Sequence, residues 1–251
     1  MKKVIAFDLD DTLAITKSPI SDSMSLLLAQ LLEHFEVCVI SGGKFEQFQT
    51  QVVERLEVSD LLLRKLHLMP TCGTRYYRYD NVKSIWVKEY AEDLTDDEKQ
   101  KIIQVIEQQA RTSGLWVEKP WGPIIEDRGS QITYSALGQQ APAEEKYKWS
   151  EANSMAKQQL RENIASMLPE LEVRLGGSTS IDITRLGIDK AYGMARLIDM
   201  LHVSKDEILF IGDKLQEGGN DFPVKAMGID VIEVDSWEDT ARILQGILHV
   251  L

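Results

Sequence analysis

Cysteine and histidine are scarce in this chain, which limits the stabilising and metal chemistry available to it. The 251 residues include two cysteines and four histidines. Two cysteines do not make a disulfide framework, and no two histidines share the His-x-x-x-His spacing found in many zinc sites. Cys38 lies inside an apolar run, where a buried small side chain is the simplest interpretation. We therefore expect a protein of the reducing cytoplasm without structural zinc.

Positive charge and long apolar runs are scarce as well. Lysine and arginine number 28 against 40 aspartates and glutamates, so the formal net charge is −12. Nucleic acids and anionic membrane surfaces attract basic proteins, and this balance therefore argues against both as partners. No stretch reaches the roughly 18 consecutive apolar residues of a membrane-spanning helix. The segment Met1–Val4 carries no leader pattern.

An acidic cluster follows the first predicted strand. Val4–Phe7 is a short apolar run of the kind that is buried on both faces of a parallel sheet. Asp8, Asp10 and Asp11 come directly after it, together with the hydroxyl of Thr12. Negative charge crowded at one strand end is costly, because like charges repel and buried carboxylates lose their hydration. A bound divalent cation would remove most of this cost, whereas a solvated acidic turn is the alternative interpretation.

Strand and helix patterns alternate through most of the chain. Apolar runs predict strands near 37–40, 66–69, 208–211 and 231–234, and amphipathic helices are predicted between them. This alternation is typical of an α/β fold with a parallel-sheet core.

The pattern changes in the middle of the chain. Residues 85–186 are rich in tryptophan and contain two predicted helices, near 95–114 and 144–168, with strand-like runs at 115–117, 132–134 and 171–174. We therefore predict core residues 1–84, an inserted α+β domain at 85–186, and a second core segment at 187–251.

Ligands of open α/β sheets bind beyond the carboxyl ends of the strands. In this chain Asp8 and Asp10 follow one predicted strand, Ser41 follows the next, and Asp213 with Lys214 follows another. Carboxylate and hydroxyl oxygens without cysteine or histidine favour Mg²⁺. A carboxylate beside a metal, a hydroxyl and a lysine together form a suitable apparatus for phosphoryl transfer, in which the carboxylate attacks phosphorus.

The order of these residues resembles that of the haloacid dehalogenase-like phosphotransferases. Their four motifs are matched by Asp8-x-Asp10-x-Thr12, Ser41, Lys190, and Gly212-Asp213 with Asn220-Asp221. The insert resembles a C2 cap of type IIB. The closest likeness is to the eukaryotic-type phosphomannomutases, because the stretches 210–221 and 176–190 are similar to theirs. The resemblance implies a Rossmann-like parallel-sheet core with an inserted α+β cap.

The resemblance also implies a role for each matching residue. Asp8 would be the nucleophile that forms an aspartyl-phosphate, and Asp10 would be the general acid and base. Thr12, Ser41 and Lys190 would complete the catalytic group by contacting the phosphoryl group or balancing its charge. Implied ligands of Mg²⁺ are Asp8, the carbonyl of Asp10, Asp213, Asn220 and Asp221. Implied substrate-binding residues are Lys17, Arg128, Ser180 and Asp182.

Departures from the mutase pattern decide which activity the sequence favours. Mutases of this kind bring several arginines to the substrate, but here Gln139 stands where a second cap arginine is expected, and Lys17 replaces another arginine. We therefore predict an Mg²⁺-dependent phosphatase of a small phosphorylated metabolite, with sugar phosphates as the favoured class. A phosphohexose mutase is the alternative, and a non-enzymatic phospho-accepting sensor is the second alternative. Pairing of two copies through the cap is implied only by the resemblance.

Overall fold

The computed structural model describes residues 1–251, which divide into two compact units. The first unit combines residues 1–91 with 189–251, and the second contains residues 92–188. The fold is α/β with a parallel-sheet core, as the sequence predicted. None of the helices combines the length and the apolar character needed to cross a bilayer.

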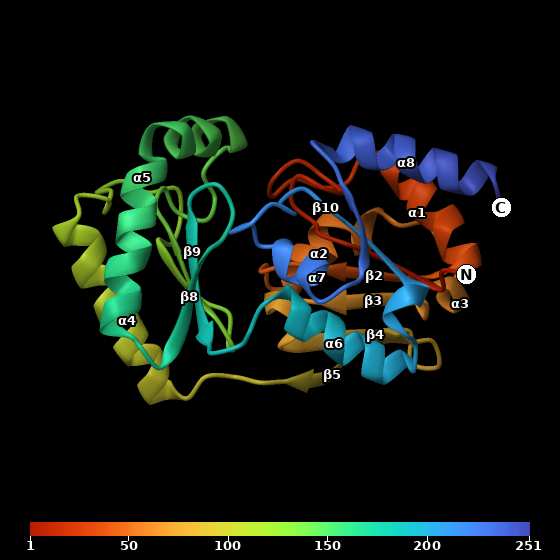
Figure 1. Ribbon diagram of the computed structural model, residues 1–251, viewed down its shortest axis with the longest axis horizontal. Coiled ribbons are helices and arrows are strands. Elements are labelled where there is room, and N and C mark those ends of the chain that lie inside the picture. Colours follow the sequence, from red (N-terminus) through yellow and green to blue (C-terminus); the bar gives the residue numbers. More distant parts are fainter. The chain divides into compact units, whose positions relative to one another are not determined.

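The first unit is built on a seven-stranded sheet with the order β11-β10-β1-β2-β3-β4-β5 (Figure 1). The five strands from β11 to β3 are parallel, and β4 and β5 add an antiparallel hairpin at one edge. The strands are β1 (Val4–Phe7), β2 (Glu36–Ile40), β3 (Leu66–Met69), β4 (Arg75–Asp80), β5 (Ile85–Ala91), β10 (Ile208–Gly212) and β11 (Asp230–Glu233).

Helices cover both faces of this sheet, which explains why its central strands are apolar throughout. On one face, Ile5 and Phe7 of β1 pack with the buried leucines of α1 and with Leu244 of α8. On the other, Val4 and Ala6 pack with Met194 of α6 and residues around α7. The helices of this unit are α1 (Asp22–His34), α2 (Phe45–Gln51), α3 (Asp60–Leu63), α6 (Lys190–Leu201), α7 (Phe222–Ala226) and α8 (Trp237–His249).

The second unit is a four-stranded antiparallel sheet with two long helices. Its strand order is β6-β7-β9-β8, formed by Ile125–Asp127, Ile132–Ser135, Ser180–Arg185 and Leu171–Leu175. Helices α4 (Asp96–Thr112) and α5 (Ala143–Met167) pack on the apolar face of the sheet. The helix α4 begins with the predicted capping box, in which Thr95 and Glu98 bond each other's backbone N–H groups.

Two details differ from the sequence expectations. Strand β5, which the predicted division assigned to the insert, pairs with β4 along its length and extends the first sheet, so that the second unit begins at Glu92. The run Leu115–Val117, predicted as a strand, has no strand partner. Instead, the carbonyl of Leu115 accepts a hydrogen bond from the hydroxyl of Tyr134, which satisfies this backbone group without a ladder.

Candidate active site

Parallel register brings the predicted motifs together at one edge of the first sheet. Phe7 of β1 is in register with Val39 of β2 and with Ile211 of β10, so the residues that follow these three strands are neighbours. The backbone N–H of Asp8 donates to the carbonyl of Ile211 at 3.1 Å, which carries the pairing one residue further. Asp8 thus lies between the chain segments that lead to Ser41 and to Asp213.

Lys190 links this edge to the start of α6. Its Nζ lies 2.7 Å from Asp8 Oδ1 and 2.5 Å from Asp221 Oδ1, and all three side chains are at most 5% exposed. The helix begins at Lys190 because the side chain of Asp189 accepts a hydrogen bond from the N–H of Tyr192. A buried charge requires partners of opposite sign, and here one ammonium group serves two carboxylates.

The carboxylates are nonetheless in excess. Oxygens of Asp8, Asp213 and Asp221 lie within 4.8 Å of one another. Burial, reinforced by the neighbouring charges of Asp221 and Asp213, raises the pKa of Asp8 to about 8 although Lys190 opposes the shift. The cluster therefore has the electrostatic character of a site that a cation would relieve, as the sequence predicted.

Unsatisfied oxygens identify which residues could hold such a cation. Asp213 Oδ1 and Asn220 Oδ1 are buried and have no hydrogen-bond partner in the protein. Asp221 differs, because Oδ1 accepts from Lys190 and Oδ2 accepts from the N–H of Lys214 at 3.1 Å. The oxygens of Asp8, Asp213 and Asn220 fit a hard divalent cation, and Asp221 belongs to the same acidic cluster while it also orients Lys190.

Two hydroxyls complete the core part of the site. Thr12 Oγ1 is buried and has no protein partner, so it is available to a bound group. Ser41 is also buried, and its Oγ accepts a hydrogen bond from the N–H of Gly43 at 3.3 Å. The predicted residues Asp8, Thr12, Ser41, Lys190 and Asp213 thus all belong to this edge.

A turn after β3 supports the segment that carries Ser41. Thr71 and Cys72 have φ of 50° and 55°, values that side chains other than glycine rarely adopt. In this conformation the N–H of Cys72 donates to the carbonyl of Ser41, and the N–H of Thr71 donates to that of Gly43, each at 3.0 Å. The sequence pattern does not predict this strained turn.

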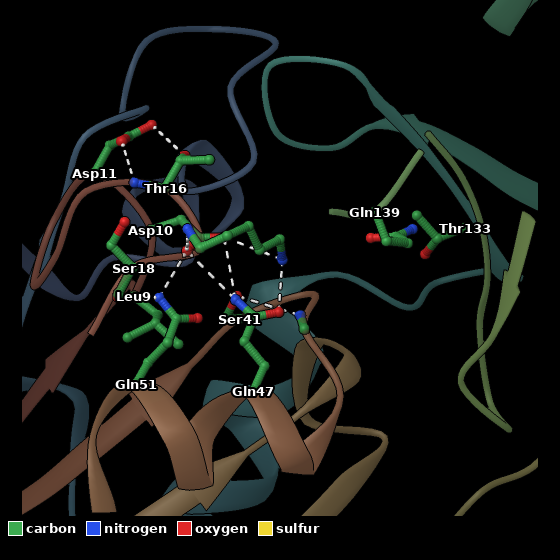
Figure 2. A network of polar contacts seen from close by, with 12 residues as sticks. Leu9, Asp10, Asp11, Thr16, Ser18, Ser41, Gln47, Gln51, Thr133 and Gln139 are labelled. Carbon is green, nitrogen blue, oxygen red and sulfur yellow. Dashed lines mark hydrogen bonds and ion pairs between the residues drawn. The ribbon is translucent and has the colours of Figure 1, made fainter. Parts of the chain in front are cut away.

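Asp10 is surrounded by hydrogen-bond donors (Figure 2). Lys17 contributes its backbone N–H, 2.8 Å from Asp10 Oδ1, and its ammonium group, 3.2 Å from Oδ2. The amide groups of Gln47 and Gln51 on α2 add further hydrogen bonds. Although burial alone would raise it, these contacts, chiefly the charge of Lys17, hold the pKa of Asp10 below its ordinary value. Sequence analysis missed both glutamines, although their spacing of four residues places them on one helix face.

The remaining predicted residues form a separate polar group in the second unit. Arg128 Nε lies 2.8 Å from Glu126 Oε2, and its Nη2 donates to Gln139 Oε1 at 3.3 Å. Asp182 Oδ1 accepts from the hydroxyl of Thr133 at 2.7 Å. Ser180 lies two residues before Asp182 on β9 and therefore on the same face of the sheet.

Comparison with known proteins agrees with the motif pattern. The family described as eukaryotic phosphomannomutase matches residues 24–250. A probable phosphomannomutase of Caenorhabditis elegans is 24% identical over 257 residues, covering 100% of this chain and 97% of that protein. The phosphomannomutase of Encephalitozoon cuniculi is 25% identical, with 96% of this chain and 91% of the relative covered. These relatives are similar along the whole chain, inserted unit included.

Solved structures share the fold at lower identity. An IMP-nucleotidase of Plasmodium falciparum superposes with a TM-score of 0.72 at 16% identity, covering 100% of this chain and 71% of that one. A haloacid dehalogenase-like hydrolase from Bacteroides thetaiotaomicron gives a TM-score of 0.63 at 15% identity, covering 98% and 100%. The family match spans nearly all of the chain, and the strand ends carry the motifs in the expected order. The chain shares its fold with a haloacid dehalogenase-like hydrolase, and it belongs to the eukaryotic phosphomannomutase family.

Proposed function

We propose that this chain catalyses Mg²⁺-dependent phosphoryl transfer on hexose phosphates, and that its net reaction is that of a phosphohexose mutase. The buried Asp8–Lys190 pair is the observation that carries the chemistry, because it provides a nucleophile whose charge is balanced by a fixed cation. The assignment to a mutase is supported by the names of the full-length relatives.

In the proposed reaction a carboxylate oxygen of Asp8 attacks phosphorus, and the bond from phosphorus to the substrate oxygen breaks. Asp10, which its hydrogen-bond donors keep ionised, first takes a proton from the hydroxyl that attacks the aspartyl-phosphate, and it then gives this proton to the oxygen that departs when Asp8 attacks the next phosphate. Thr12 and Ser41 are suited to hydrogen-bond the phosphoryl oxygens, since both side chains are buried and both follow strands that end at the same edge of the sheet as the strand before Asp8. Mg²⁺, held by Asp8 and Asp213 with Asn220 nearby, would neutralise charge on the phosphoryl group.

The second unit would supply recognition of the rest of the substrate. Arg128, Ser180 and Asp182 are proposed to bind the sugar or a distal phosphate, and Lys17 to contact the substrate from the first unit. Gln139 is a further candidate because its Nε2 is buried without a hydrogen-bond partner. An unsatisfied buried amide donor is expected to find its acceptor in a ligand.

A phosphatase remains the second candidate, and one observation favours it. Arg128 is paired with Glu126 in a largely buried contact, and Gln139 rather than an arginine lies beside it. This group offers less positive charge than a bisphosphate would require. In a phosphatase, water instead of a sugar hydroxyl would discharge Asp8. The sequence alone favoured this activity, whereas the relatives' names give better support to the mutase.

One experiment separates the two activities. Purified chain is incubated with Mg²⁺ and hexose 1-phosphate, with a catalytic amount of the hexose 1,6-bisphosphate. We expect the 6-phosphate to accumulate without stoichiometric inorganic phosphate. Release of inorganic phosphate without the 6-phosphate would reject the mutase in favour of the phosphatase. Asp8→Asn is the control, and full turnover by this variant would contradict both activities.

A further inference from the structure

Two glutamines on one short helix converge on the carboxylate of Asp10 (Figure 2). Gln47 Nε2 donates to Asp10 at 3.3 Å from Oδ1 and 3.2 Å from Oδ2. Gln51 Nε2 lies 3.3 Å from Oδ1 but makes its shorter contact, 2.6 Å, with the carbonyl of Ser18. Of the two glutamines, Gln47 is therefore the one whose Nε2 donates mainly to Asp10.

The oxygen of the Gln47 amide also makes a hydrogen bond. Its Oε1 accepts a hydrogen bond from Lys17 Nζ at 2.5 Å, and the same ammonium group lies 3.2 Å from Asp10 Oδ2. The three side chains form a closed triangle in which the amide contacts both charged groups. Because an amide has one donor end and one acceptor end, it can contact a carboxylate and an ammonium group at once. A carboxylate or an ammonium group at position 47 could not do so.

The backbone nearby leaves room for this arrangement. A Cβ at Gly43 would lie 2.4 Å from Gln47 Oε1 and 2.7 Å from its Cδ. The glycine thus permits the Gln47 side chain to fold back across the start of α2. Gly43 lies between Ser41 and α2. One short segment therefore carries both the hydroxyl that is proposed to bind phosphate and Gln47, which contacts Asp10.

We propose that Gln47 is a positioning residue that fixes the Asp10 carboxylate and the Lys17 ammonium group in one arrangement, from which Asp10 exchanges a proton with the substrate oxygen. This inference rests on the proposed phosphoryl transfer through Asp8. A general acid must lie within hydrogen-bond reach of the oxygen it serves, and small misplacements reduce the rate strongly. The hydrogen bonds of Gln47 are with Asp10 and Lys17, so we infer that it acts through Asp10.

The role predicts a dependence on the leaving group. An alkyl phosphate such as benzyl phosphate releases an alkoxide that must be protonated as it leaves, so its cleavage requires a correctly placed Asp10 that first takes up the proton carried by the monoanion of the ester. p-Nitrophenyl phosphate releases a stable anion and needs little help from an acid. Loss of Gln47 should therefore slow the first ester much more than the second. A general loss of structure would slow both to the same extent.

The test compares kcat/KM for the two esters in the parent and in Gln47→Met, which keeps the length of the side chain and removes the amide. Because kcat/KM reports steps up to departure of the leaving group, later hydrolysis of the aspartyl-phosphate does not enter. We expect a loss of about tenfold for benzyl phosphate and of less than about twofold for p-nitrophenyl phosphate. Gln49→Met, on the same helix, is the matched control and should leave both values unchanged.

Further variants make the outcome decisive. Asp10→Asn should show the same selectivity between the esters, with a larger loss of about 10²-fold or more for benzyl phosphate. Equal losses for both esters in Gln47→Met, or no loss for either, would overturn the positioning role. If the methionine variant does not fold, Gln47→Ala is measured by the same ratio. Turnover of p-nitrophenyl phosphate that survives in Asp8→Asn would instead contradict the proposed function, and the inference would fall with it.

Discussion

Lys190 Nζ lies 2.7 Å from Asp8 Oδ1, at the end of a side chain that is 1% exposed. The same ammonium group holds Asp221, whose side chain is fully buried. Removing a buried cation leaves its partners uncompensated, and this is more damaging than never having had the pair. The geometry therefore links the stability of the first unit to Lys190, the residue that also balances the charge of Asp8, the proposed nucleophile.

Lys190→Met should lower both stability and activity. We expect a decrease of about 3 kcal/mol in the free energy of unfolding and a loss of about 10²–10³-fold in turnover of p-nitrophenyl phosphate. The double variant Lys190→Met with Asp221→Asn removes one of the orphaned charges, so it should recover part of the stability and none of the activity. Urea denaturation and steady-state kinetics measure the two effects. Activity within about twofold of the parent would contradict the role of Lys190.

Asp213→Asn should weaken the binding of Mg²⁺. The Oδ1 atom of Asp213 is buried without a protein partner, which makes it an available ligand. We expect at least about a tenfold loss of affinity in titration calorimetry. Asp199→Asn, an exposed carboxylate on α6, is the control and should bind like the parent. Unchanged affinity in Asp213→Asn would place the metal elsewhere.

The stability of the second unit should depend on pH because of the carboxylate of Glu98. Its carboxylate accepts a hydrogen bond from Arg185 at 2.9 Å and one from the N–H of Thr95 at 2.6 Å. The contact with Arg185, followed by that with Thr95, lowers the pKa of Glu98 to about 2 from its ordinary value of 4.5. Because the folded pKa is the lower one, the stabilisation is fully present above pH 4.5 and is lost as the pH falls towards 2.

The measurement compares Glu98→Gln with the parent across this window. At pH 7 we expect the variant to be less stable by about 1 kcal/mol, a modest value because both partners are partly exposed. The difference should shrink as the pH falls below 4.5. Thermal unfolding followed by circular dichroism gives the two curves. A difference that stays constant down to pH 2 would show that the charge of Glu98 contributes nothing.

Much of the site follows from the sequence for a simple reason. Residues directly after parallel strands share one edge of the sheet, so Asp8, Ser41 and Asp213 could be grouped before their distances were known. Contacts that depend on side-chain direction could not be grouped in this way. Gln47, for example, folds back towards Asp10 past Gly43, where a Cβ would lie 2.4 Å from its Oε1. No periodic pattern encodes such a contact.

The edge of the insert was harder to predict for another reason. Strand β5 has no buried residue, so its sequence shows no face that marks its sheet, and its pairing with β4 assigns it to the first unit. Partner choice in a hairpin at a domain boundary depends on the turn and on the surfaces available to both strands. Asp11 has a backbone conformation that the sequence pattern did not predict either: its φ is 64°, and its carboxylate accepts hydrogen bonds from the N–H and the hydroxyl of Thr16.

Gly193 on α6 gives a prediction in which packing and helix propensity have opposite signs. Replacing a helical glycine by alanine normally stabilises a helix by about 1 kcal/mol. A Cβ at Gly193 would lie 2.4 Å from Ile40 Cδ1 and 2.7 Å from the carbonyl oxygen of Cys72. The carbonyl belongs to the strained turn after β3, so it cannot move without disturbing the support of Ser41. We therefore expect Gly193→Ala to destabilise the protein by about 1–3 kcal/mol.

The matched control is Gly246→Ala on α8, where an added Cβ meets nothing within 4 Å. Only the propensity effect acts there, so this variant should be more stable than the parent by up to about 1 kcal/mol. Denaturation midpoints compare the two substitutions directly. Because Lys190 lies at the start of the same helix as Gly193, displacement of α6 should also reduce phosphoryl transfer in Gly193→Ala and leave it unchanged in Gly246→Ala. If both Gly193→Ala and Gly246→Ala stabilised the protein, α6 could shift away from the turn without loss of stability. Its close approach to the turn would then not position Lys190.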